Sequence, residues 1–239
     1  TIYNILLIIS SYSLPLAVSK LVSANISQGR RRNVYRILKC ALIFALVSGT
    51  AAAAILYFGA DFITGTLLRT PLCIFALKVL VPVLVIVAVL GVMRGFFQGL
   101  GTMMPSAVSQ ILEQIVNAIV SVWAAYVLFS YGSKAGALLG NAEDYGAAYG
   151  AAGGTIGTAA GALSALLFAG FVLVVYLRVF KKTLRKERKT CADSYGEIFK
   201  LLIITIIPVL VSSTIYNCNA TIDQAVYKNI AAWQGYSKT

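Results

Sequence analysis

Histidine is absent from this sequence of 239 residues, and acidic residues number only eight. The chain therefore lacks the commonest general base and metal ligand near neutral pH. No H-E-x-x-H motif, P-loop or Ser/His/Asp set is present, so neither hydrolysis nor ATP coupling has residues to carry it. The four cysteines are scattered and form no CxxC pair, which leaves no pattern for a metal site or a disulfide framework. We expect a protein that is not an enzyme and holds no metal.

Charged residues make up only 12% of the chain, about half of the share found in a soluble domain. Hydrophobic residues make up 59%, and the mean hydropathy is +0.84. They form long runs, and a bilayer-spanning helix needs about 20 mostly apolar residues. We predict an all-α polytopic membrane protein with six spans and the start of a seventh, the six lying near 2–22, 38–58, 72–93, 106–131, 151–177 and 198–216. A polar, glycine-rich connector is expected at 132–149.

The net charge is +12, and most of the positive charge lies in two clusters beside apolar runs. A basic chain can bind nucleic acid, but this placement is typical of segments that orient a membrane protein against anionic headgroups. If the predicted spans alternate, fifteen of the 20 Lys and Arg residues fall on one side. The positive-inside rule then places the basic loops 24–36 and 178–190 in the cytoplasm, together with Arg94, and the connector around Glu143 outside. The expected partners are anionic membrane lipids and not nucleic acid.

Two charges interrupt the apolar character of residues 89–114 (VLGVMRGFFQGLGTMMPSAVSQILEQ). Arg94 ends the third predicted span, Glu113 lies about two turns into the fourth, and a hairpin with Pro105 joins the two spans. Charged residues are costly in bilayer hydrocarbon and usually face a protein interior or a water-filled cavity. Arg94 can be a cation that anchors its helix at the membrane interface, and Glu113 a locally paired structural acid. The alternative is that both belong to a functional site.

Polar residues in the fourth span share one helical face, namely Ser106, Gln110, Glu113, Asn117 and Ser121. The sixth span carries a second stripe, formed by Thr205, Pro208, Ser212, Tyr216, Asn219 and Asp223. Such residues can serve as hydrogen-bonding contacts between helices. Two phased stripes, one of which contains a carboxylate, favour instead a shared hydrophilic cavity of the kind in which transport proteins bind their substrates.

Small residues gather in two of the predicted spans. The second span has a centre of glycine, alanine, serine and threonine over 48–54, and the fifth has Gly153, Gly157 and Gly161 at four-residue spacing. Small residues allow helix backbones in a membrane to approach closely. We therefore expect tight helix packing at both places.

Three segments carry a family resemblance: SLPLAVSKLVS (13–23), RGFFQGLGTMMPSAVSQILEQIV (94–116) and NATIDQAVYKNIAAWQGYS (219–237). They resemble the polysaccharide biosynthesis and stage V sporulation protein B group, which includes the MurJ-type lipid II flippases. The wider superfamily exports drugs, oligosaccharidyl-lipids and polysaccharides through about fourteen helices in two lobes, a repeat architecture common among transporters. The resemblance implies a fragment of that fold, with residues 1–197 in the N-terminal lobe, whose first helix is missing. Residues 198–239 would be the first helix of the C-terminal lobe and the start of the next.

The resemblance also implies a function, the flipping of an undecaprenyl-pyrophosphate-linked cell-wall precursor such as lipid II by alternating access. Arg94 and Lys20 would then contact the headgroup at the cytoplasmic mouth, because arginine suits phosphate oxygens. Glu113 would pair with a cation or bind a coupling ion. The other implied substrate-binding residues are Ser19, Gln110, Asn117, Asn219 and Asp223. No cofactor is implied, only coupling to the membrane potential or to a monovalent cation, and we expect a monomer.

Other functions remain open at this point. An exporter of another polysaccharide-lipid or of a cationic drug would share the fold, although a cationic drug would prefer a cavity rich in acids. A membrane-embedded glycosyl- or phosphotransferase would need an acidic metal-binding cluster, and the neighbouring acids Glu143 and Asp144 are expected on the outer side. A scaffold without transport activity would leave the phased polar stripes without a purpose.

Overall fold

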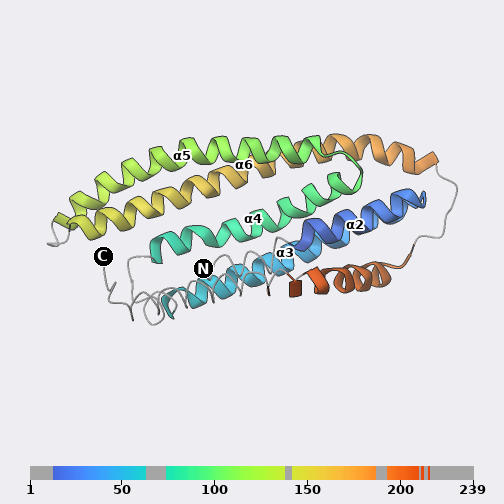
Figure 1. Ribbon diagram of the computed structural model, residues 1–239, viewed down its shortest axis with the longest axis horizontal. Coiled ribbons are helices and arrows are strands. Elements are labelled where there is room, and N and C mark those ends of the chain that lie inside the picture. The colour runs from blue at the N-terminus through green and yellow to red at the C-terminus, as the bar shows by residue number, and fades with distance from the viewer. Residues whose placement is uncertain are drawn as a thin grey trace, which may run out of the picture.

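The computed structural model describes residues 13–62, 74–137, 142–186, 193–209, 211, 212 and 215, and the regular structure in these ranges is helical throughout. The helices are α2 (Ser13–Ser27), α3 (Arg31–Phe62), α4 (Ile74–Gly99), α5 (Met104–Ala137) and α6 (Ala142–Lys186). A further helical segment covers 195–209. Figure 1 shows an elongated bundle in which α5 and α6 lie side by side along most of their lengths. The prediction of an all-helical fold is confirmed for this part of the chain.

Among the described residues, four helices are long and apolar enough to cross a membrane, namely Arg31–Gly59, Leu77–Gly99, Met104–Ala137 and Tyr145–Phe180. They coincide with the second to fifth predicted spans. Of the first predicted span, residues 13–22 lie in α2 and the rest lies outside the described residues. Of the sixth, residues 198–209 are helical. The four candidate spans identify a multi-pass membrane protein.

The prediction of a polar connector at 132–149 is wrong. Helix α5 continues to Ala137 and α6 begins at Ala142, so most of this segment is helical. Two of the glycines that indicated a loop, Gly132 and Gly146, lie instead where the two helices touch. A Cβ added to Gly132 would lie 2.7 Å from the carbonyl oxygen of Tyr145, and one added to Gly146 would lie 2.5 Å from the Ser133 hydroxyl. Close packing between helices outweighs the low helix propensity of glycine.

The basic segments 24–36 and 178–190 are also more helical than the predicted loops. Helix α2 runs to Ser27 and α3 begins at Arg31, while α6 continues to Lys186. Lysine and arginine are good helix formers, so a basic cluster at the end of a span need not interrupt the helix. The connection from α2 to α3 needs only residues 28–30.

Two glycines close the short turns after α2 and α4. Gly29 and Gly101 have φ angles of 71° and 80°, the left-handed region that glycine adopts at little cost. After α4, the N–H of Gly101 donates to the carbonyl of Gln98 at 3.0 Å. The N–H of Thr102 donates to the carbonyl of Phe97 at 3.1 Å. This is the Schellman pattern, and the same two bonds close α2 at Gly29.

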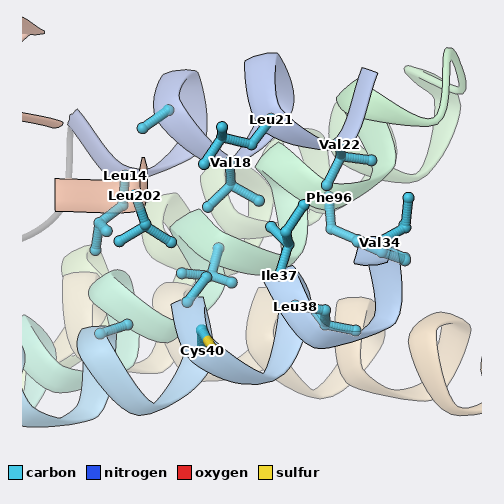
Figure 2. Packing of buried hydrophobic residues seen from close by; sticks show 14 of the residues in the cluster. Leu14, Val18, Leu21, Val22, Val34, Ile37, Leu38, Cys40, Phe96 and Leu202 are labelled. Atoms are coloured by element: carbon cyan, nitrogen blue, oxygen red, sulfur yellow. The ribbon is translucent and has the colours of Figure 1, made fainter. Parts of the chain in front are cut away.

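One apolar core joins α2, α3, α4, α6 and the segment 195–209 (Figure 2). Its largest side chains with less than 2% exposure include Leu14, Val18, Val22, Leu38, Phe96 and Leu202. Helix α5 takes almost no part in it and presents a row of exposed apolar side chains, among them Ile111, Ile115, Ile119, Val122 and Trp123. An apolar exposed row of this kind suits a helix that faces lipid.

The predicted small-residue contacts are confirmed. A Cβ at Gly153 would lie 2.5 Å from the carbonyl oxygen of Ala124, and one at Gly161 would lie 2.6 Å from that of Glu113. Between them, a Cβ at Gly157 would overlap Ser121. The glycine face of α6 therefore lies directly on the backbone of α5. In the second predicted span, a Cβ at Gly49 would lie 3.2 Å from the Cβ of Ala88 on α4.

Candidate functional site

The α4–α5 hairpin places the last turns of α4 beside the first turns of α5. The Schellman turn at Gly101 ends α4, and Pro105 lies in the first turn of α5, where proline costs no helix hydrogen bond. Two further glycines allow this end of α4 to pack closely against α2. A Cβ on Gly95 would lie 2.5 Å from the Pro15 carbonyl oxygen, and one on Gly99 would lie 2.8 Å from that of Ser19. Arg94, next to Gly95, thus lies at the end of α4, which packs against α2 and is joined by a short turn to α5.

Arg94 and Glu113 form an ion pair inside this hairpin. The Nη2 atom of Arg94 lies 2.7 Å from Oε2 of Glu113, and its Nε donates to the Ser109 hydroxyl at 2.9 Å. The side chains are 14% and 20% exposed. The Nε–Nη2 edge of the guanidinium is therefore engaged by α5, and the two charges compensate each other where either alone would be costly.

Two buried serines join the same part of α5 to α4. Ser109 is 0% and Ser106 is 4% exposed. The Ser109 hydroxyl donates to the Ser106 carbonyl at 2.7 Å while it accepts from Arg94. The Ser106 hydroxyl donates to the backbone carbonyl of Arg94 at 3.2 Å. The ion pair is thus held in a hydrogen-bonded frame, and the guanidinium has little freedom to rotate.

The predicted polar stripe of α5 divides between two neighbours. Its N-terminal members Ser106 and Glu113 face α4, whereas Ser121 faces α6. The Ser121 hydroxyl lies 3.0 Å from the carbonyl oxygen of Gly154 on α6 and 2.8 Å from Oδ1 of Asn117, and its single hydrogen can go to either. Ser121 therefore makes the kind of interhelical contact that the sequence left as the alternative, while Asn117 accepts within α5. Gln110 is exposed.

The remaining predicted site residues are not joined to the ion pair. Lys20 is exposed on α2, and Ser19 is half-buried at the contact between α2 and α4. In the described part of the chain, no hydrogen bond or ion pair connects either of them to Arg94 or Glu113. Asn219 and Asp223 lie outside the described residues. Substrate contact by these residues stays a prediction.

Ser109 belongs to the site but was not among the predicted residues. It lies four residues before Glu113 and three after Ser106, so helical spacing places it on the same face. A further signal for Ser109 is the number of donors on a guanidinium. One carboxylate does not satisfy all of them, so a hydroxyl on the same face can accept from Arg94. Polarity alone did not distinguish it from Gln110, its exposed neighbour.

The chemistry available at this site is the exchange of one ion-pair partner for another. Among the described residues, no three His, Cys, Asp or Glu side chains gather as a metal site would require. An anion that binds Arg94 in place of Glu113 would leave the Glu113 carboxylate to bind a proton or a small cation. In the same way, a cation that binds Glu113 would leave Arg94 to bind an anion. Arginine is well suited to this because its planar fork matches both carboxylate and phosphate oxygens.

Comparison with known protein families adds an independent finding. The family model described as "Polysaccharide biosynthesis protein" matches residues 1–232 of this chain. No curated protein and no solved structure matched. The family match extends over almost the full length and includes all four candidate spans and both members of the ion pair. The chain therefore belongs to the polysaccharide biosynthesis protein family.

Proposed function

We propose that this protein is a flippase that moves an undecaprenyl-pyrophosphate-linked cell-wall precursor, lipid II or a related lipid-linked oligosaccharide, across the cytoplasmic membrane. The observation that carries the proposal is the Arg94–Glu113 pair between two candidate membrane spans of a polysaccharide biosynthesis family protein. Ionisable residues inside a membrane are costly and commonly mark substrate or ion pathways, so transport gives this pair a use.

The headgroup of such a lipid carries a pyrophosphate and sugars that must pass about 30 Å of hydrocarbon. In the proposed cycle Arg94 leaves Glu113 for the phosphate oxygens, and Glu113 takes up a proton or a monovalent cation. The exchange keeps the site close to neutral at each stage, which limits the cost of moving charge through a medium of low dielectric constant. The membrane potential or the bound cation would then supply the direction of transport.

An exporter of another polysaccharide-lipid is the nearest alternative and would use the same residues. A cationic drug fits less well, because the charges around the hairpin and the neighbouring turns are mostly positive. Catalysis is not part of the proposal.

The orientation that we propose places the basic turns in the cytoplasm. Figure 1 shows that the α2–α3 turn, the α4–α5 turn and the C-terminal end of α6 lie at the same end of the bundle. These places hold the two basic clusters and are close to Arg94. The grouping supports a single cytoplasmic face under the positive-inside rule.

A cysteine-labelling experiment tests this orientation. Thr102, in the turn before α5, and Lys134, in the last turn of α5, are both exposed, so each can be replaced by cysteine in a full-length protein without other cysteines. We expect a membrane-impermeant maleimide to label Lys134→Cys in intact cells and Thr102→Cys only after lysis. Labelling of Thr102→Cys in intact cells, with Lys134→Cys protected, would show that the topology is the opposite of the one proposed.

A genetic experiment tests the substrate. The full-length protein should restore growth to a bacterial strain depleted of its own lipid II flippase. A variant with Lys134→Gln, an exposed charge far from the hairpin, serves as the matched control and should also restore growth. If the well-expressed protein fails to rescue, lipid II is not its substrate, and export of another polysaccharide-lipid becomes the better proposal.

A further inference from the structure

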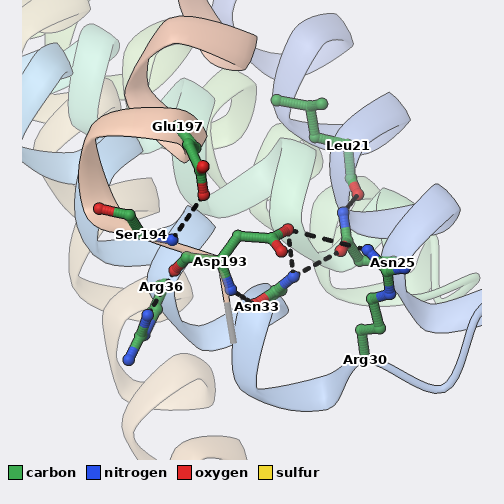
Figure 3. A network of polar contacts seen from close by, with 8 residues as sticks. All are labelled: Leu21, Asn25, Arg30, Asn33, Arg36, Asp193, Ser194 and Glu197. Carbon is green, nitrogen blue, oxygen red and sulfur yellow. Dashed lines mark hydrogen bonds and ion pairs between the residues drawn. The ribbon is translucent and has the colours of Figure 1, made fainter. Parts of the chain in front are cut away.

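A polar network joins two regions far apart in the chain, the α2–α3 connection with the start of α3 and the residues just before the segment 195–209 (Figure 3). Asp193 lies at its centre. The carboxylate Oδ2 of Asp193 accepts a hydrogen bond from Nδ2 of Asn33 at 2.6 Å, and the backbone N–H of Asp193 donates to Oδ1 of Asn33 at 3.1 Å. One asparagine side chain thus binds both the side chain and the backbone of a residue 160 positions away.

Asn33 lies in the first turn of α3, directly after the α2–α3 connection. Its side chain is only 1% exposed, and its Nδ2 also lies 3.3 Å from Oδ1 of Asn25 on α2. Asn25 is itself oriented by its donation to the Leu21 carbonyl at 2.9 Å. A buried amide costs free energy unless it is hydrogen-bonded, so loss of Asp193 would leave Asn33 without its strongest acceptor.

Two arginines approach Asp193, Arg30 from the α2–α3 connection and Arg36 from the start of α3. The Arg30 Nη1 lies 3.9 Å from the carboxylate, and Arg36 donates to the backbone carbonyl of Asp193. The guanidinium of Arg36 also lies over the ring of Tyr195, 4.9 Å from its centroid. The Arg30 and Asp193 side chains are 50% and 35% exposed, so water can reach them and take their place when the contact opens.

Beyond this network, the segment 195–209 is held by a single apolar stripe. Ile198, Leu202 and Ile206 enter the core shared with α2 and α3, and Phe199 makes an edge contact with Phe44 on α3. Several other large side chains of the segment are exposed, including Leu201, Ile204 and Ile207. Its first turn is capped internally, because the N–H of Ser194 donates to the Glu197 carboxylate at 2.9 Å. The Asn33–Asp193 contact is thus the polar attachment at the start of an otherwise narrowly packed helix.

We infer that Asn33 and Asp193 form a latch that holds the segment 195–209 on the first turn of α3, and that this latch opens during transport. The opening step rests on the proposed function, whereas the docking step does not. A charge-assisted contact at a water-reachable site can form and break repeatedly, because both states find partners for the charges. The latch lies on the face that we propose to be cytoplasmic, so its opening would change access from that side.

The docking step is tested by the exposure of a buried position. Ile198 is 2% exposed and lies just beyond the latch, so Ile198→Cys in a full-length protein without other cysteines reports undocking through its rate of maleimide modification. Asp193→Ala should raise that rate about 10-fold or more, the scale of a lost charge-assisted hydrogen bond. The exchange Asn33→Asp with Asp193→Asn should return the rate toward that of the parent protein. Glu197→Gln is the matched control and should change it less than about two-fold, because an exposed cap contributes little beyond its own turn. An unchanged rate in Asp193→Ala would overturn the latch.

The opening step is tested by closing the latch covalently. Asn33→Cys and Asp193→Cys in the full-length protein can be joined by a short bifunctional thiol reagent and released by a reductant. We expect headgroup translocation to stop on joining and to recover on reduction. Translocation that continues in the joined protein would overturn the opening step. Absence of translocation in the parent protein would instead contradict the flippase proposal and leave the modification result intact.

Discussion

Replacement of Arg94 by glutamine should reduce headgroup translocation about 10- to 100-fold, because a charge-assisted contact to phosphate is lost in the transition between states. The same change should destabilise the fold, since it leaves the Glu113 carboxylate without its cation. Removal of one partner from a buried pair costs up to about 3–5 kcal/mol. We expect Arg94→Gln to lower the free energy of unfolding by about 3 kcal/mol or less, because a fifth of the Glu113 side chain is exposed and can be solvated.

The double variant Arg94→Gln with Glu113→Gln separates the two effects. With both charges removed, most of the stability should return, because buried ion pairs contribute little net stability over neutral residues of similar size. Translocation should stay low. Arg94→Lys should translocate at a rate between those of the parent protein and the double variant. Lysine keeps the charge but cannot contact Ser109 and Glu113 at once. Thermal unfolding in detergent and translocation in membranes provide the two measurements, with Lys134→Gln as the control. A double variant that translocates at the parent rate would make the pair a structural element only.

The second large effect is expected at the contact between α5 and α6. Gly157→Ala should destabilise the protein by about 1–3 kcal/mol, because the added methyl group overlaps Ser121 and the helices must separate. Gly154, three residues earlier on the same helix, has no atom within 4 Å of an added Cβ. Gly154→Ala should therefore stabilise the helix by up to about 1 kcal/mol.

The opposite signs of these two changes make the comparison informative. Both variants replace glycine by alanine in the same helix, so the gain in helix propensity is the same in each. The thermal midpoint of the purified protein is the measurement, with fluorescence-detected gel filtration as a check on the folded fraction. Equal shifts in both variants would contradict the packing of the glycine face on α5.

How far the sequence predicted this structure can be seen in particular residues. The four central spans followed from apolar runs, and the contact at Gly153, Gly157 and Gly161 followed from their spacing, because small residues have one strong packing use in membrane helices. The connector at 132–149 was mispredicted because glycine is typical of both loops and close helix contacts. Only the presence of a partner helix decides between them, and that partner is a tertiary feature.

The candidate site shows the same limit. Arg94 and Glu113 were expected near one hairpin, but their direct pairing depends on the rotation of α5 against α4, which a one-dimensional pattern does not fix. The stripe through Asn117 and Ser121 was interpreted as one surface, although α4 and α6 each take a part of it. The contact between Asn33 and Asp193 joins residues 160 positions apart, and no local signal indicates it.

The most direct test of the central claim is the transfer of the lipid II headgroup to the outer face of the membrane. The full-length protein would be the only flippase in the cell, and outward-facing lipid II would be measured by its susceptibility to an enzyme that acts outside. The account predicts that lipid II becomes accessible with the parent protein and with Lys134→Gln, and stays inside with the Arg94→Gln and Glu113→Gln double variant. Lipid II that remains inside with the well-expressed parent protein would contradict the claim.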